Sequence, residues 1–291
     1  MQFVFLLEQL ANGLVLGGYY LLLALGLSLI FSVGGIVNLA HGAFYAIGAY
    51  LSLVIGGQLG WGAGVVLSPV AVGLLGILFE RFLLRRFYTA DPILSLLVTF
   101  GLAMVAEQAI RMIWGAAPLS SNMPAGFKGN VVLGEFLFSR YRLFLLVVVL
   151  GVMTALWLLL HKTAFGRVVR AGVQRPDMVA VLGIKLQPYM TAIVVLGVAS
   201  AALGGALFGP ITIVHPAMGT EIMTVAFVVV VIGGLGSFWG VVLAALLVGV
   251  VRGATIHFVP AAGEASMYVL MFLVLMFRPR GLLGERIERF E

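Results

Sequence analysis

Side chains that could do chemistry are few in this sequence and lie far apart. The four histidines, at positions 41, 161, 215 and 257, form no HExxH pair and have no carboxylate at metal-ligand spacing, so a catalytic metal centre is not expected. There is no cysteine to act as a nucleophile or to form a disulfide. Neither a G-x-S-x-G nucleophile elbow nor a G-x-x-x-x-G-K-[ST] phosphate loop occurs. We therefore expect no enzyme activity and no cofactor bound by this chain itself.

Three acidic or basic side chains, counting Asp, Glu, Lys and Arg, fall inside long apolar stretches. Glu107 and Arg111 are four residues apart, so they share one face of a helix. Charged groups within a membrane are rare and often lie on a substrate or proton path, which makes this pair a candidate pathway site. The alternative, which we favour, is an internal ion pair near the end of the helix. Arg252 is expected to face protein or to reach the membrane interface.

Other polar residues flank breaks in the apolar pattern. His41, with Asn38 and Gly42 close by, either lines a pathway or caps the helix that it opens. His215 and Glu221 flank a short apolar run, where a polar gate is one interpretation and ordinary loop residues are the favoured one.

The stretch Thr163–Lys185 is a basic island between long apolar segments. Its first part predicts a short helix over 165–172. Pro176 is suited to the first position of a second helix, and Gly183 to its C-cap. Such a helix has only about two turns and is not stable alone in water. A partner that accepts its apolar face would stabilise it, although a plain connecting loop on the lipid headgroups is the alternative.

Composition places these residues in an α-helical membrane protein. The 291 residues are 62% hydrophobic and only 10% charged, with a mean hydropathy of +1.17. A soluble domain carries roughly 25% charged residues. Many apolar runs approach the roughly 20 residues that cross a bilayer as helix, and none shows the period-two alternation of a transmembrane barrel. We expect one domain over 1–291, all-α, with eight or nine transmembrane or re-entrant helices.

The expected elements follow from these apolar runs. Seven runs are long enough to span: 10–31, 39–55, 61–79, 93–114, 143–160, 189–208 and 237–258. Two more, 222–234 and 265–277, are short. A tight loop is expected over 56–60, and Asp91 with Pro92 predicts a helix start. At 1.5 Å per residue the short runs give about 20 Å of helix, so they are either extended or half-helices buried against protein.

The distribution of Lys and Arg predicts the orientation, because cytoplasmic loops carry the excess of positive charge. The N-terminus is then outside and the C-terminus inside. The residues expected inside are Arg81, Arg85, Arg86, Lys162, Arg167, Arg170, Arg175, Lys185, Arg278, Arg280, Arg286 and Arg289; those expected outside are Lys128, Arg140 and Arg142.

Five motifs in order resemble one family along the whole chain. They are GIVNLAHG at 35–42, DPILSLLVTFG at 91–101, GRVVRAGVQRPDMVAVLGI at 166–184, VIGGLGSFWG at 231–240 and RPRGLLG at 278–284. The third resembles the coupling loop of ABC importer permeases, in the form used by branched-chain amino acid (LivH/LivM-type) permeases. The first and last motifs favour the H-type subunit. An acid often found after the His-Gly pair is replaced by Ala43 and Phe44.

The resemblance implies a transport subunit of the bacterial inner membrane. It implies a second homologous permease, two cytoplasmic ATPase subunits that bind ATP, and a periplasmic binding protein that delivers a branched-chain or other hydrophobic amino acid. The island is then a cytoplasmic coupling loop. Its candidate docking residues are Gly166, Arg167, Arg170, Ala171, Asp177, Val179, Leu182 and Gly183, and the possible pathway residues are Asn38, His41, Gly42, Glu107 and Arg111. A permease for urea or short amides, and an ion-coupled secondary transporter, are the alternatives.

Overall fold

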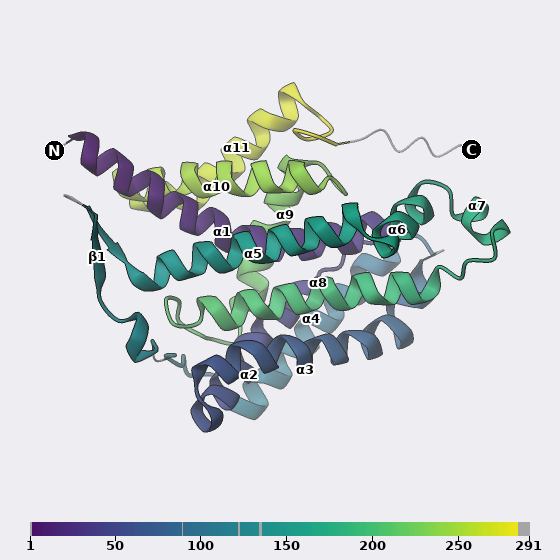
Figure 1. Cartoon of the computed structure of the whole chain (residues 1–291), viewed down its shortest axis with the longest axis horizontal. Helices are drawn as coiled ribbons and strands as arrows, with labels where there is room; N and C mark the ends of the chain where they lie inside the picture. The colour runs from purple at the N-terminus through teal and green to yellow at the C-terminus, as the bar shows by residue number, and fades with distance from the viewer. Residues whose placement is uncertain (1, 89, 122, 134–135, 285–291) are drawn as a thin grey trace.

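The structure, a computed structural model, describes residues 2–88, 90–121, 123–133 and 136–284. Within that part the chain is helical except for a two-stranded hairpin and connecting loops (Figure 1). The long helices are α1 (Gln2–Gly34), α2 (His41–Leu59), α3 (Trp61–Phe82), α4 (Pro92–Trp114), α5 (Arg140–Lys162), α6 (Ala164–Gln174), α8 (Gln187–Phe208), α9 (Met218–Gly233), α10 (Phe238–Phe258) and α11 (Gly263–Phe277). The short elements are η1 (Leu84–Phe87), η2 (Ala125–Phe127), β1 (Asn130–Leu133), β2 (Phe136–Ser139), α7 (Pro176–Val181) and η3 (Pro260–Ala262).

Eight helical stretches of the described chain are long and apolar enough to cross a membrane. The predicted all-α membrane fold is therefore confirmed. At the start of α4, Asp91 Oδ1 accepts a hydrogen bond of 2.8 Å from the Ile93 amide, and Pro92 is the first helical residue, as predicted. The seven predicted long spans all correspond to helices.

Two predicted boundaries are wrong. The tight loop over 56–60 does not form, because α2 continues to Leu59 and only Gly60, with φ of +91°, separates it from α3. Each glycine costs a helix about 1 kcal/mol, which is too little to end a helix in an apolar setting. The second short run is also longer than predicted, since η3 and α11 together cover 18 residues from Pro260 to Phe277.

The bundle has two distinct ends. Figure 1 shows the N-terminus and β1 at one end and α6 and α7 at the other. Arg85 Nη2 lies 3.3 Å from Thr191 Oγ1, which joins η1 to the first turns of α8, just after the island. The grouping of Arg85 and the island at one end is thus a property of the fold, while Arg286 and Arg289 lie outside the described residues.

The element order contains an inverted repeat. The series α1, α2, α3, η1, α4 is followed, after α5 to α7, by α8, α9, α10, η3, α11. Equivalent pairs pack together, since α1 lies on α10 as α8 lies on α3, and α2 contacts α4 as α9 contacts α11. The helices α1 and α8 cross where Gly26 and Gly197 meet: a Cβ on Gly26 would lie 2.5 Å from the Gly197 carbonyl oxygen.

In each repeat the second helix begins part-way through the bundle. The His41 ring at the start of α2 lies against Gly26, two turns before α1 ends at Gly34, which is about 12 Å of helix. In the other repeat α9 has only 16 residues. The two starts touch, because a Cβ on Gly42 would lie 2.1 Å from the Gly219 carbonyl oxygen. Two re-entrant segments, residues 35–40 and 209–217, lead to these starts.

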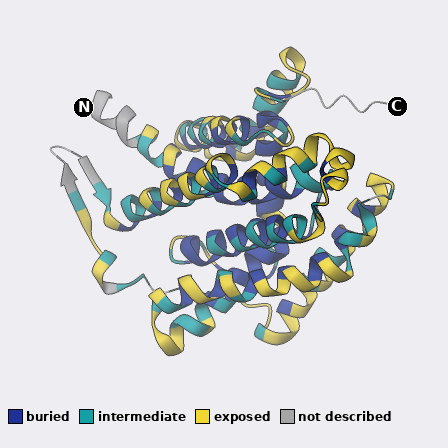
Figure 2. Ribbon diagram, turned by 45° about the vertical axis from the view of Figure 1, so that its right-hand side comes forward, coloured by how far each residue is buried: buried dark blue, intermediate teal, exposed yellow. Residues whose placement is uncertain are grey.

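Small residues let the central helices approach closely. A Cβ on Gly13 would lie 2.7 Å from the Val250 Cα atom, and one on Gly17 would lie 2.9 Å from the Ala245 carbonyl oxygen, so α1 and α10 are in backbone contact. Gly13 and Gly17 have the small-xxx-small spacing that permits such contact between membrane helices. Figure 2 shows the buried residues along the middle of the bundle and the exposed ones on the outer helices.

Candidate functional site

The basic island forms a helical hairpin, α6–α7, at one end of the bundle (Figure 1). Arg175 separates the two helices and Pro176 opens α7, as the sequence predicted. Gly183 follows with φ of +76°, a conformation that favours glycine. Val181 at the end of α7 and Leu182, which caps it, are 84% and 74% exposed. This end of the molecule therefore presents apolar side chains that the chain itself leaves uncovered.

The hairpin is anchored to α5 rather than loosely tethered. Thr163 Oγ1 donates to the Leu159 carbonyl oxygen at 2.6 Å and accepts from the Gly166 amide at 3.2 Å. The Arg170 guanidinium donates to the Leu160 carbonyl oxygen. A Cβ on Gly166 would lie 1.9 Å from that same oxygen, so only glycine fits this corner. These contacts attach the start of α6 firmly to the end of α5.

The predicted docking residues therefore divide into two groups. Gly166 and Val179 are buried, so they shape the hairpin itself. The exposed members, which another chain could reach, are Arg167, Arg170, Ala171, Asp177, Leu182 and Gly183. Their role in docking stays a prediction.

A buried carboxylate, Glu80, joins this end of α3 to α8. Both of its oxygens bond Arg85, at 3.3 Å to Nε and 3.1 Å to Nη2, and Thr191 Oγ1 donates to Oε2 at 2.8 Å. Tyr88 donates to Oε1 at 3.4 Å. Burial and the neighbouring Glu80 carboxylate raise the pKa of the Tyr88 phenol well above its usual value, so Tyr88 stays protonated and able to donate. The start of α8, which follows the hairpin, is thus fixed to α3 and η1.

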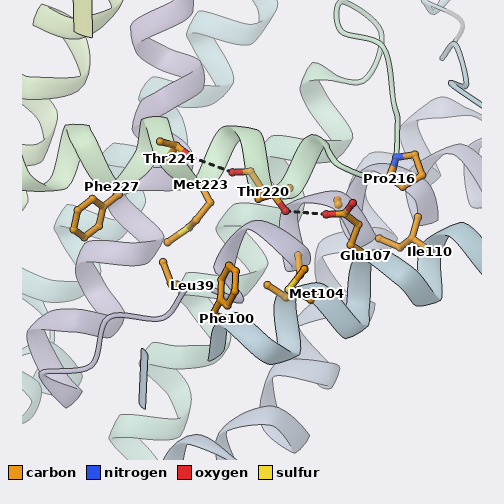
Figure 3. Close-up of a pocket in the computed structure, with 14 residues that line it drawn as sticks. Leu39, Phe100, Met104, Glu107, Ile110, Pro216, Thr220, Met223, Thr224 and Phe227 are labelled. Atoms are coloured by element: carbon orange, nitrogen blue, oxygen red, sulfur yellow. Dashed lines mark hydrogen bonds between the residues drawn. The ribbon is translucent and has the colours of Figure 1, made fainter. Parts of the chain in front are cut away.

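A cavity of about 310 Å³ opens between α2, α4 and α9, where the two re-entrant segments end (Figure 3). Broken helices in corresponding positions of two inverted repeats mark substrate sites in transporters. The cavity wall is almost wholly apolar. Its apolar side chains include Leu39, Ala43, Phe100, Met104, Met223 and Phe227.

One charged group, Glu107, lies on this apolar cavity. Its Oε1 atom is 2.7 Å from Arg111 Nη2, and its Oε2 atom accepts from Thr220 Oγ1 at 2.9 Å. Figure 3 shows the bond between Glu107 and Thr220 across the gap from α4 to α9. The ion pair that we favoured is confirmed, with side chains 24% and 40% exposed for Glu107 and Arg111. Glu107 itself lines the cavity, and Arg111 is bonded to it from outside the cavity wall, so the two interpretations are compatible.

The other predicted pathway residues lie behind the cavity rather than on it. His41 is fully buried, with Nε2 3.1 Å from the Leu23 carbonyl oxygen. The alternative that His41 caps α2 is wrong, since Ala40 occupies the N-cap. Asn38 is buried and accepts from the Ala40 amide at 3.1 Å. Only the neighbouring residues of this segment reach the cavity, and a pathway role for Asn38, His41 and Gly42 stays a prediction.

Arg252 faces protein. This was one of the two positions expected from the sequence, the other being the membrane interface. Its Nη1 atom donates to the Tyr20 hydroxyl at 2.5 Å, and its side chain is 19% exposed. His215 Nε2 lies 3.5 Å from Glu221 Oε2 beside the start of α9. In the part of the chain that the structure describes, no cluster of three or more metal-ligating side chains forms.

Sequence reasoning missed Thr220, Thr191 and Tyr88. Thr220 is 113 residues from Glu107 along the chain, and Thr191 is 111 residues from Glu80. No local spacing signals such contacts. A weak signal did exist for the first: NLAHG at 38–42 and HPAMG at 215–219 share Ala and Gly at the same offsets, and both open a re-entrant helix.

Comparisons with known proteins agree over nearly the whole chain. A family model described as "Branched-chain amino acid transport system / permease component" matches residues 9–277. The chain is 27% identical over 300 residues to the high-affinity branched-chain amino acid transport system permease protein LivH of Escherichia coli (strain K12), covering 97% of each chain. It is 29% identical over 296 residues to the corresponding protein BraD of Pseudomonas aeruginosa, covering 96% of this chain and 95% of that one.

A solved structure shares the fold. It is described as PsaBC from Streptococcus pneumoniae in complex with Fab, and it matches with a TM-score of 0.51 over 96% of this chain and 92% of that one. The identity is 10%, so the likeness is one of fold alone.

Proposed function

Because the chain belongs to the branched-chain amino acid transport permease family, we propose that it is the membrane-spanning permease subunit of an ATP-driven importer for branched-chain or other hydrophobic amino acids. The family and the eight apolar helices make it a multi-pass membrane protein. The observation that carries the finer proposal is the anchored hairpin α6–α7, which presents exposed cationic and apolar side chains at one end of the bundle.

The hairpin is the proposed docking site for an ATPase. This chain has no phosphate loop of its own, so ATP hydrolysis would belong to two partner subunits. Each coupling hairpin would fit into a groove of one ATPase, with the apolar α7 face inserted and Arg167 at the rim. Because Arg170 and Gly166 tie α6 to α5, a push on the hairpin would move the bundle as a rigid body.

The remaining partners follow from the same arrangement. A second, homologous permease would complete the pathway. A periplasmic binding protein would deliver the amino acid to the opposite end, where the β1–β2 hairpin and residues 209–217 lie. We propose the inner membrane of a bacterium as the location, with the N-terminus outside and the C-terminus cytoplasmic. A urea or short-amide substrate remains the alternative within the family.

Isolation of the tagged chain from its native membrane in mild detergent tests this assembly. We expect two ATP-hydrolysing subunits and a second permease to co-purify with it. Recovery of the chain alone, together with uptake driven by an ion gradient, would favour a secondary transporter and contradict the proposal.

A further inference from the structure

We propose that the cavity between α2, α4 and α9 binds one free amino acid with an apolar side chain, with Glu107 holding its ammonium group and Arg111 its carboxylate. The proposal rests on the proposed function and deepens it, because it names a site within this chain for the amino acid that is carried.

The wall of the cavity fits an aliphatic side chain. The volume of about 310 Å³ lies at the lower end of the range for small-molecule sites. Phe100 and Met104 come from α4, and Met223 and Phe227 from α9, so the wall is built from both repeats (Figure 3). An aliphatic side chain placed there loses its contact with water, which is the main source of affinity for apolar groups.

The charged pair fits the backbone end of an amino acid. Glu107 uses one acceptor position of each oxygen, toward Arg111 and Thr220. A carboxylate offers about four such positions, so two remain for an ammonium group. Arg111 has five N–H donors, of which the described residues occupy one. Glu107 on the cavity wall and Arg111, which is bonded to it one helical turn further along α4, therefore place a negative and a positive group side by side at the edge of the cavity, complementary to a zwitterion.

The charges also argue against an apolar occupant. A lipid chain, or an apolar side chain from a second permease, would fill the apolar cavity without any polar contact to Glu107. An ionised group at membrane depth is expensive and needs partners. Thr220, from the opposite helix, orients the carboxylate at 2.9 Å toward the cavity edge. This arrangement is explained by a ligand that carries charge as well as an aliphatic part.

The absence of cysteine allows a direct test by single-cysteine labelling. Ala103 lines the cavity, and Ala103→Cys is the reporter. Gln58→Cys, at the exposed end of α2, is the matched control. The full chain in lipid nanodiscs is treated with N-ethylmaleimide, with and without L-leucine, 4-methylpentanoate (no ammonium) or 3-methylbutylamine (no carboxylate).

We expect leucine, at about ten times its dissociation constant, to slow labelling of Ala103→Cys about tenfold, because only about a tenth of the sites stay empty. Labelling of Gln58→Cys should not change. The two analogues should protect at least about tenfold less well than leucine, since each lacks one charge-assisted hydrogen bond.

Two second-site variants assign the charges. In the Ala103→Cys background, Glu107→Gln should remove the preference for leucine over 4-methylpentanoate, and Arg111→Gln the preference over 3-methylbutylamine. Glu264→Gln, which changes a carboxylate on α11 that is 83% exposed, should leave both preferences intact.

The outcomes that overturn the site are distinct from those that overturn the importer. Equal protection by all three compounds would mean an apolar cavity with no zwitterion site. A reporter that is unreactive without leucine would mean that lipid or another chain fills the cavity. In either case ATP-driven leucine uptake by the whole assembly could persist, and the proposed function would stand. If leucine protects Ala103→Cys but the assembly shows no ATP-driven uptake, the binding site stands and the proposed function is overturned.

Discussion

At the scale of single residues, two charged side chains inside the bundle, Arg252 and Glu80, are each tied to a partner on another helix. Arg252 of α10 is held by the Tyr20 hydroxyl of α1. Glu80 of α3 is held by Arg85 and by Thr191 of α8. Such ties have a physical reason, because an unpaired charge removed from water costs several kcal/mol. They also fix the position of one helix along its neighbour.

Replacing Glu80 with alanine should destabilise the folded chain. The side chain of Glu80 is 1% exposed, and its loss leaves the Arg85 guanidinium without its carboxylate partner, although the Thr191 hydroxyl can still donate to the Gln187 carbonyl oxygen at 3.0 Å. Arg85 is 35% exposed and can recover some hydration, so we expect a loss of about 2 kcal/mol in the free energy of unfolding. Thermal unfolding in detergent measures it.

The control for Glu80 is Arg86→Ala, which truncates an exposed side chain in η1, next to Arg85. It should change the free energy of unfolding by less than about 0.5 kcal/mol. Equal effects of the two substitutions would mean that the Glu80 cluster contributes nothing to stability.

At the scale of elements, the sequence predicts a helix well and its ends less well. Asp91 and Pro92 marked the start of α4 because capping is local chemistry. The glycines at 56 and 57 misled, because they lie inside α2. Their small helix penalty is outweighed by the surroundings, which local sequence does not reveal. The predicted run at 265–277 was too short because Gly263 and Glu264 in the first turn of α11 interrupt the apolar pattern.

The close contact between the starts of α2 and α9 predicts that one added methyl group at Gly42 destabilises the fold. In Gly42→Ala the new Cβ would lie 2.1 Å from the Gly219 carbonyl oxygen, which is backbone and cannot move aside cheaply. We expect the free energy of unfolding to fall by about 3 kcal/mol. Gly57→Ala, on the same helix with no atom within 4 Å, should instead be neutral or stabilising by about 0.5–1 kcal/mol. Equal melting temperatures for the two variants would contradict the close contact.

Substitutions in the hairpin α6–α7 should abolish ATP-coupled uptake without preventing folding and membrane insertion. Ala171→Glu places a bulky charge on the exposed face of α6, and Gly183→Glu adds strain at φ of +76°. Both proteins should insert in the membrane, and both should lose ATP-coupled uptake by at least about tenfold, because docking and the transmitted push are lost. Arg81→Gln, a charge change at an exposed residue of α3 outside the hairpin, is the control. If uptake survives both Ala171→Glu and Gly183→Glu, the hairpin is not the docking site for the ATPases.

At the scale of the whole molecule, the inverted repeat decides where function can lie. It places the starts of α2 and α9 against each other inside the bundle, and the cavity forms there. Glu107 and Arg111 were recognised from their spacing of four residues, which is local. Their partner Thr220 and the apolar wall from α9 come from the packing of distant segments. Spacing along the chain cannot reveal such a site.

The proposed orientation, with the N-terminus outside and the hairpin inside, predicts which residues a reagent outside the cell can reach. Gln58→Cys lies near the end that carries the N-terminus, and Arg167→Cys lies on the hairpin at the opposite end. In intact cells a membrane-impermeant maleimide should label Gln58→Cys from outside. It should label Arg167→Cys only after the inner membrane is permeabilised. The reverse pattern would place the hairpin outside and rule out docking of cytoplasmic ATPases.

The central claim is that this chain forms the path and a partner supplies the energy. The most direct measurement is uptake of labelled leucine into proteoliposomes that contain the chain, its second permease, the ATPases, internal ATP and external binding protein. We expect uptake that stops when ATP or the ATPases are left out and that does not respond to imposed proton or sodium gradients. Uptake by the chain without ATPases, driven by such a gradient, would contradict it.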